Sequence, residues 1–222
     1  PTLEPNPKMI QQAANLIKNS NKPILYVGGG IIHSKANQEL FDLATKFNIP
    51  VVTTLMGRGA FPDGHELCLE MPGMHGNYTA TTSIQKSDLL IAIGVRFDDR
   101  VTANPSFFAQ NAKVIHADID PAEIGKVREA QVPIVGDAKS VILGLINALG
   151  DTKLNTENWI NELNSMKTEF PLSYNQNENG PLKVPFVLEE LQNLTEEEAI
   201  VVSGVGQHQM WISQHWNFTE PN

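Results

Sequence analysis

The segment LLIAIGVRFDDRVT, residues 89–102, passes from five consecutive apolar residues through a glycine to four charged side chains. A strand that is apolar at every position is buried on both faces, as in parallel sheets covered by helices on both sides. Ligands of such sheets bind beyond the carboxyl ends of the strands. The segment therefore predicts a central strand with a binding site at its tip, where the charged residues are Arg96, Asp98, Asp99 and Arg100.

The same kind of apolar run recurs at 23–27, 50–53, 114–117 and 132–135. Helix-period segments stand between the runs, for example at 9–18 and 37–47. This βα alternation predicts an α/β fold with a doubly wound parallel sheet over residues 1–150.

The pattern changes after residue 150. Residues 151–183 hold an amphipathic stretch at 156–170 and the polar run NQNENG at 175–180, and we interpret them as a linker or connecting segment. A helix is predicted at 184–194 and a strand at 199–203, as the start of a second, incomplete α/β domain over 184–222. We therefore expect the chain to be a fragment of a longer protein.

Composition excludes several function classes. The net charge is −9, from 25 acidic and 16 basic residues, which disfavours binding to nucleic acid or to anionic lipid. The single cysteine, Cys68, allows neither an intrachain disulfide nor a cysteine-based zinc site, and no metal ligands are predicted. No apolar run reaches the ~20 residues that span a bilayer. We expect a soluble, unsecreted protein that binds small molecules or protein partners.

Each loop after a strand has a functional and a structural interpretation. Glycines 28–30 bring backbone close to a ligand or form a tight turn, and they do not match the G-x-G-x-x-G spacing. Arg58, in the loop 53–60, is a ligand contact or a solvated charge. The run GMHG at 73–76 closes over a flat cofactor or is a simple turn. The four charges at 96–100 bind a phosphate or carboxylate, or form a surface ion-pair cluster.

Carboxylates follow the last two strands. We assign Asp118 to a ligand, because an acidic residue at this place commonly accepts hydrogen bonds from ribose hydroxyls. Asp120, before Pro121, is assigned to a helix N-cap, which Glu123 completes. Asp137 is either an N-cap or an adenosine contact.

Taken together, in order and spacing, these runs resemble the central domain of thiamine-diphosphate enzymes, and among them the acetohydroxyacid synthase family. The resemblance covers nearly the whole chain and is weakest at 151–183. It rests on GGG at 28–30, TTLMGRGAFPDGH at 53–65, PGMHG at 72–76, GVRFDDRVT at 94–102, DIDPAEIGK at 118–126 and GVGQHQMW at 204–211.

The resemblance implies that FAD, without a net redox role, lies extended across the domain. The expected contacts are Gly28, Gly29, Gly30, Thr54, Leu55, Met56, Gly73, Met74, His75, Gly76, Gly94, Arg96, Asp98, Arg100, Val101, Asp118, Ile119, Asp137 and Ala138. It also implies that Met74, His75, Asp99 and Arg100 face the substrate channel, where Arg100 grips the carboxylate of the second ketoacid. Thiamine diphosphate would contact Gly206, Gln207 and His208.

For the whole enzyme, the resemblance implies decarboxylation of pyruvate and ligation of the product to pyruvate or 2-ketobutyrate, with thiamine diphosphate and Mg²⁺. The activating glutamate and the GDG…N magnesium motif are not in this sequence, so no catalytic residue is assigned and the fragment alone is expected to be inactive. The family also implies a homodimer or tetramer, a regulatory subunit, and a location in the cytoplasm or plastid stroma.

Two alternatives remain open. One is a stand-alone FAD- or nucleotide-binding module of the same fold, since fold does not fix function. The other is a different thiamine-diphosphate enzyme, such as pyruvate oxidase or glyoxylate carboligase. The tail GVGQHQMW argues against the first, and its combination with FDDRVT argues against the second.

Overall fold

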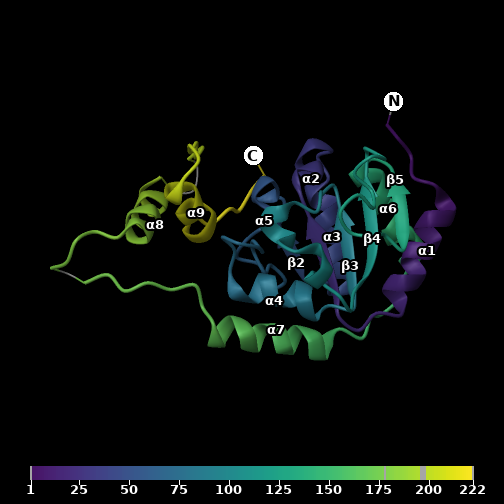
Figure 1. Cartoon of the computed structure of the whole chain (residues 1–222), viewed down its shortest axis with the longest axis horizontal. Coiled ribbons are helices and arrows are strands. Elements are labelled where there is room, and N and C mark those ends of the chain that lie inside the picture. Colours follow the sequence, from purple (N-terminus) through teal and green to yellow (C-terminus); the bar gives the residue numbers. More distant parts are fainter. Residues whose placement is uncertain (1, 178, 196–198, 222) are drawn as a thin grey trace.

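A computed structural model describes residues 2–177, 179–195 and 199–221. Its centre is a five-stranded sheet in the order β2-β1-β3-β4-β5, with every pair parallel (Figure 1). The predicted doubly wound α/β fold is confirmed. The strands are β1 Pro23–Val27, β2 Val51–Thr53, β3 Leu89–Ile93, β4 Lys113–Asp118 and β5 Val132–Val135.

Side chains alternate between two cores because successive residues of a strand point to opposite faces of the sheet. Leu25 and Ile91 belong to one core, under helices α1 Pro7–Lys18, α3 Asn37–Phe47 and α6 Ala138–Leu149. Ile24 and Leu90 belong to the other, under α4 Tyr78–Lys86 and α7 Glu157–Glu169. Helices thus bury both faces, as the uniformly apolar strands predicted.

Short elements occupy the loops that follow the strands. They are α2 Gly29–His33, η1 Leu55–Gly57, α5 Asp99–Thr102 and η2 Pro105–Phe107. The edge of the sheet at β2 is covered by the segment 67–70, whose backbone donates to and accepts from β2. Among the residues that the structure describes, no helix is long and apolar enough to cross a membrane.

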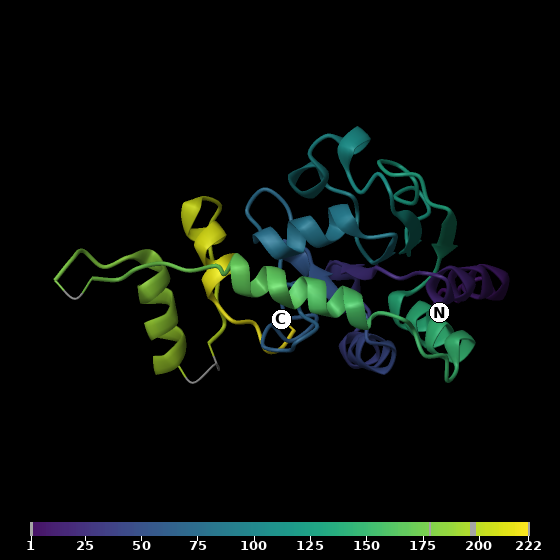
Figure 2. The same cartoon turned by 90° about the horizontal axis from the view of Figure 1, so that it is seen from below.

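Helix α7 falls inside the predicted connecting segment and packs firmly on the sheet. Trp159 is 1% exposed and donates its indole N–H to the Pro23 carbonyl at 3.2 Å. Glu162 bridges Lys22 at 2.6 Å and Lys86 at 3.0 Å. Seen from below, the helix runs alongside α4 (Figure 2), and its contact with Pro23 places it at the amino end of β1.

The last part of the chain contains α8 Val184–Leu194 and α9 Gln207–His215, which pack against each other. The amide of Gln192 and the backbone of Asn217 exchange two hydrogen bonds at 2.7 and 2.9 Å. The prediction of a strand at 199–203 is wrong. These residues are not in a sheet, and Ile200 and Val202 are 91% and 90% exposed.

Candidate functional site

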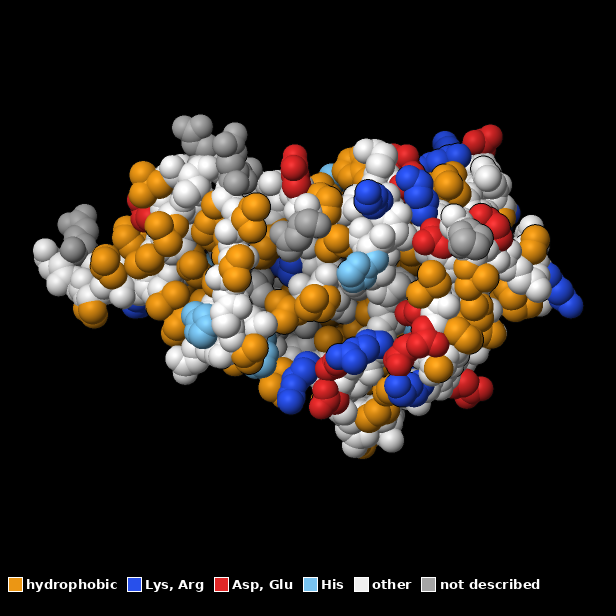
Figure 3. All heavy atoms as spheres, turned by 90° about the horizontal axis from the view of Figure 1, so that it is seen from above, with side chains coloured by type: hydrophobic (Ala, Val, Ile, Leu, Met, Phe, Trp, Pro, Cys, Tyr) orange, Lys and Arg blue, Asp and Glu red, His pale blue; other side chains and the backbone are white. Residues whose placement is uncertain are grey.

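A cleft of about 820 Å³ opens beyond the carboxyl ends of the strands. This volume lies within the range of small-molecule and cofactor sites. Figure 3 looks onto this end of the sheet, where acidic, basic and apolar side chains surround a hollowed surface. The lining residues are Gly28, Gly29, Gly30, His33, Ser34, Thr54, Leu55, Met56, Gly94, Val95, Arg96, Asp98, Arg100, Val101, Ala117, Asp118, Ile119, Glu123, Gly136, Asp137 and Ala138.

The floor of the cleft is backbone, where the loops after β1 and β3 meet. Gly30 donates its N–H to the Gly94 carbonyl at 3.0 Å, and a Cβ on Gly30 would lie 2.5 Å from the Gly94 Cα. Gly94 has φ +58°, in the region that favours glycine. The interpretation of glycines 28–30 as a tight turn is therefore confirmed, and the turn lines the cleft, where the predicted ligand contact stays a prediction.

An apolar wall comes from the loop after β2. Leu55 and Met56 are 41% and 72% exposed although both are large and apolar. Such side chains at the rim of a cleft suit the flat face of a ring system rather than a phosphate. Thr54, beside them, donates its backbone N–H to the Val27 carbonyl at 2.9 Å and so ties this wall to the glycine floor.

Charged groups come from the loop after β3. Asp98 caps α5 by accepting from the Arg100 N–H at 3.1 Å and pairs with Arg96 at 2.8 Å. The backbone N–H of Arg100, with help from Arg96, holds the pKa of Asp98 below its usual range. The Arg96 side chain is 72% exposed. The predicted surface ion pair therefore exists, and it leaves a guanidinium accessible at the cleft.

The far end of the cleft carries the two carboxylates predicted after β4 and β5. Asp118, partly exposed, accepts from the Asp120 N–H at 2.9 Å. Asp137 caps α6, accepting from Lys139 and Ser140, as one of its interpretations predicted. The prediction that Asp120 caps a helix is wrong: its carboxylate accepts from the Ala122 N–H, but a series of turns follows it.

Some predicted site residues lie outside this lining. The GMHG run at 73–76 adjoins the cleft, since Met74 donates its N–H to the Arg100 carbonyl at 2.9 Å. Met74 is 64% exposed. Asp99 begins α5 but does not line the cleft. Gly206, Gln207 and His208 lie at the start of α9 and line neither cavity that the structure shows.

Sequence reasoning missed several lining residues. Glu123 was assigned to the start of a helix. The remaining missed residues were not predicted at all, although each lies next to a predicted residue or one turn into α2. Their adjacency to strand ends was the available signal. The missed residues are His33, Ser34, Val95, Ala117, Glu123 and Gly136.

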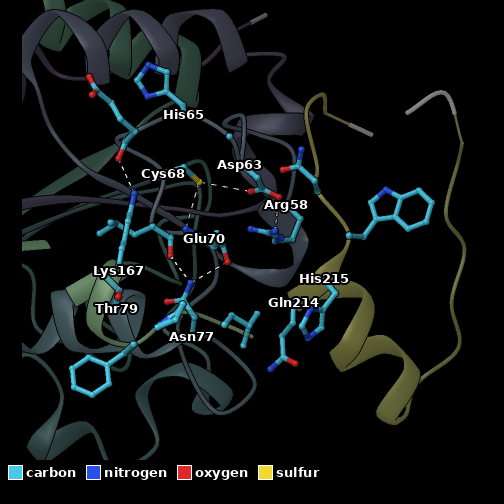
Figure 4. A pocket seen from close by; sticks show the side chains of 18 of the residues that line it. Arg58, Asp63, His65, Cys68, Glu70, Asn77, Thr79, Lys167, Gln214 and His215 are labelled. Carbon is cyan, nitrogen blue, oxygen red and sulfur yellow. Dashed lines mark hydrogen bonds and ion pairs between the residues drawn. The ribbon is translucent and has the colours of Figure 1, made fainter. Parts of the chain in front are cut away.

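A second cavity, of about 460 Å³, lies between the 58–79 loops, the end of α7 and the end of α9 (Figure 4). Arg58 and Asp63 form a buried ion pair on its wall, with side chains 4% and 6% exposed. The interpretation of Arg58 as a solvated charge is therefore wrong. Burial raises the pKa of Asp63 to about 6 and that of the Cys68 thiol to about 12.

The titratable groups of the domain favour binding over catalysis. Cys68 is a protonated thiol at neutral pH, not a nucleophile. His116 is buried against the Val95 carbonyl at 2.9 Å, and burial lowers its pKa, so its neutral ring has a structural role. Among the described residues, no three acidic, histidine or cysteine side chains form a metal cluster.

Comparison with known proteins places these features in context. Residues 10–145 match the family described as thiamine pyrophosphate enzyme, central domain. The chain is 51% identical to acetolactate synthase of Mycobacterium leprae and 49% identical to the acetolactate synthase large subunit of Corynebacterium glutamicum, in both cases over 100% of this chain and 36% of the relative. It is 43% identical to chloroplastic acetolactate synthase 2 of Nicotiana tabacum, over 98% of this chain and 33% of the relative. The chain thus spans about a third of these proteins.

Proposed function

The chain belongs to the thiamine pyrophosphate enzyme family, whose central domain it contains, and from this premise we propose that it is the FAD-binding part of an acetolactate synthase. The carrying observation is the cleft, whose lining includes most positions predicted to contact FAD. The similarity to bacterial and plant acetolactate synthases supports the reaction: decarboxylation of pyruvate and ligation to pyruvate or 2-ketobutyrate.

The residues present fit an extended flavin dinucleotide. Glycines 28–30 and Gly94 expose backbone at the floor, and the apolar wall of Leu55 and Met56 suits the isoalloxazine ring. Asp118 is open to ribose hydroxyls. Asp137 already occupies the first N–H groups of α6, so this end suits the adenosine rather than a phosphate. Bound FAD would serve as a structural cofactor without net redox chemistry.

Other residues would act in the intact enzyme. Arg100 would hold the carboxylate of the second ketoacid, with Met74, His75 and Asp99 along the same channel. Gly206, Gln207 and His208, at the start of α9, would contact thiamine diphosphate, whose Mg²⁺ ligands lie outside this sequence. We further propose a homodimer or tetramer with a regulatory subunit, in the cytoplasm or plastid stroma.

A stand-alone nucleotide-binding module is less well supported. The relatives match across 98–100% of the chain, which includes α9 as well as the sheet. A module that binds only a nucleotide in the cleft has no need of the GVGQHQMW segment. Pyruvate oxidase and glyoxylate carboligase are also less well supported, because the relatives of this chain are acetolactate synthases.

Titration with FAD, followed by flavin fluorescence, tests the cleft. We expect saturable binding, and we expect Arg96→Ala and Asp118→Ala each to weaken it about tenfold, by the loss of a charge-assisted hydrogen bond. Lys8→Ala, on the exposed face of α1, is the matched control and should bind like the unchanged protein. The full-length protein should also form acetolactate from pyruvate with thiamine diphosphate and Mg²⁺.

Two results would contradict the proposal. FAD binding that survives both substitutions would place the flavin elsewhere. A full-length protein that binds FAD but forms no acetolactate would retain the cleft assignment and overturn the assigned reaction.

A further inference from the structure

The end of α9 and the segment 216–220 that follows it lie against the loop 58–65, which comes after β2 (Figure 4). Asp63 donates its N–H to the Phe218 carbonyl at 3.0 Å, and Phe218 donates its N–H to the Asp63 carboxylate at 2.8 Å. Gln214 donates its amide to the His75 carbonyl at 2.9 Å. Backbone and side chain of one residue, Asp63, therefore hold the segment after α9 at Phe218.

Arg58 completes this attachment. Its guanidinium pairs with the Asp63 carboxylate at 2.5 Å and lies 5.0 Å from the centre of the Phe218 ring. Its Nε is buried and has no hydrogen-bond partner in the described part of the chain. Burying two charges can cost more than their attraction returns, so such a pair is weak evidence for stability. The position of the Arg58 guanidinium next to the Phe218 ring says more about the role of the pair.

The loop is shaped to receive the segment. Gly59 has φ +80°, and a Cβ placed on it would overlap the backbone carbonyl of Glu220. Asp63, in the same loop as Gly59, is hydrogen-bonded to Phe218, two residues before Glu220. The close approach at Gly59 and the hydrogen bonds at Asp63 thus fix two successive points of the chain after α9.

We propose that Arg58, Gly59 and Asp63 form a clasp that positions α9 against the FAD domain, and that Arg58 and Asp63 are thereby positioning residues for thiamine diphosphate. The clasp acts beyond the carboxyl end of α9, and the residues proposed to contact thiamine diphosphate lie at the start of the same helix. Trp216, between α9 and Phe218, is 8% exposed and donates its backbone N–H to the Ile212 carbonyl of α9 at 3.0 Å, so a shift at Phe218 reaches the helix. This inference rests on the proposed function, which places thiamine diphosphate at Gly206, Gln207 and His208.

The test uses the full-length protein with Asp63→Ala, Asp63→Asn and Arg58→Leu. We expect Asp63→Ala and Arg58→Leu to raise the thiamine diphosphate concentration for half-maximal activity about tenfold, because each leaves the other member of the buried pair without its partner and loosens the segment after α9. Affinity for FAD should stay unchanged. Asp63→Asn keeps an acceptor for the Phe218 N–H, so it should raise the thiamine diphosphate concentration for half-maximal activity less than Asp63→Ala does. Lys22→Ala, which breaks the 2.6 Å pair with Glu162 on α7, is the control and should leave the half-saturation unchanged.

A second variant pair separates contact from backbone strain. Gly59→Ala should reproduce the effect of Asp63→Ala. Gly150→Ala introduces a similar backbone strain, at φ +59°, but its Cβ meets nothing within 4 Å. It should therefore leave the thiamine diphosphate concentration for half-maximal activity unchanged.

The clasp would be overturned if all variants of an active protein reached half-maximal activity at the same thiamine diphosphate concentration. Parallel losses of FAD and thiamine diphosphate affinity would also overturn it, because these indicate general damage. If the unchanged full-length protein shows no thiamine-dependent activity, the proposed function fails instead, and hydrogen exchange decides on the clasp. Faster exchange at Phe218 in Asp63→Ala supports it, and unchanged exchange overturns it.

Discussion

At Asp63 the protein holds a carboxylate where ionisation is costly. Burial raises the pKa of this group from 3.8 to about 6, even though Arg58 and the Phe218 N–H act in the opposite direction. Desolvation therefore outweighs pairing. The Asp63 carboxylate is consequently mostly ionised only above about pH 6. Where it is ionised, the buried Arg58–Asp63 pair reduces the stability of the folded protein.

This shift predicts a pH dependence of stability. Between about pH 4 and pH 6 the folded protein keeps a proton on Asp63 that the unfolded chain has released, so the free energy of unfolding falls as the pH rises through this window. Asp63 alone accounts for a decrease of about 3 kcal/mol, the equivalent of a two-unit shift. Urea unfolding at several pH values should show this decrease, and Asp63→Asn should abolish it.

Asp151→Asn serves as the control for that measurement. The Asp151 side chain is fully exposed, so its substitution should leave the slope against pH as it is in the unchanged protein. A slope that persists in Asp63→Asn would assign the titration to another group.

From sequence, the position of a residue in the cleft could be predicted where a strand tip alone determines it. Asp118 and Arg96 line the cleft because parallel strands end at a common edge. Arg58 also follows a strand, but its burial depends on Asp63 and on Phe218, which lies 160 positions further along the chain. No local pattern identifies such a partner.

At the scale of elements, α7 shows how a segment that resembles a linker becomes part of a domain. Its sequence is largely polar, and the apolar positions Trp159, Leu163 and Met166 are spaced to lie on one face. All three are buried against the sheet. The helix therefore contributes to the second core although it lies outside the predicted limits of the first domain.

Removal of the central side chain of this helix is expected to destabilise the domain strongly. Trp159→Ala should lower the free energy of unfolding by about 3–5 kcal/mol, because it leaves a cavity and removes a buried hydrogen bond. Glu162→Gln should cost less than about 1 kcal/mol, because its ion pairs with Lys22 and Lys86 are partly exposed. Urea unfolding of both variants measures the difference. Equal effects would mean that α7 is held by charge rather than by packing.

The element predictions differ in outcome for one physical reason. The five runs at 23–27, 50–53, 89–93, 114–117 and 132–135 became strands because each has a neighbour in the sheet. The run at 199–203 has the same apolar, β-branched composition and no neighbouring strand in the described chain. Strand propensity is a preference for a pleated, half-buried surface, and it has no effect where that surface is absent.

At the scale of the molecule, β3 and the segment 199–205 are opposite extremes of burial and of backbone pairing. β3 is hydrogen-bonded on both sides, to β1 and β4, and every one of its residues is buried. The segment 199–205 exposes Ile200, Val202 and Val205 by 91%, 90% and 92%. Exposed β-branched residues that are not paired in a sheet of the described chain form a template for pairing with another chain.

Hydrogen exchange of the chain by itself should reproduce this contrast. At low protein concentration we expect the amides of Ile91 and Ala92 to exchange at the rate of global unfolding, and those of Ile200 and Val202 to exchange nearly as fast as in an unfolded peptide. At higher concentration, protection at 200–205 should rise if the segment pairs between molecules, while β3 remains unchanged. Protection of Ile200 and Val202 at every concentration would instead mean that the segment finds a partner within its own chain, and the open arrangement of these residues would then be wrong.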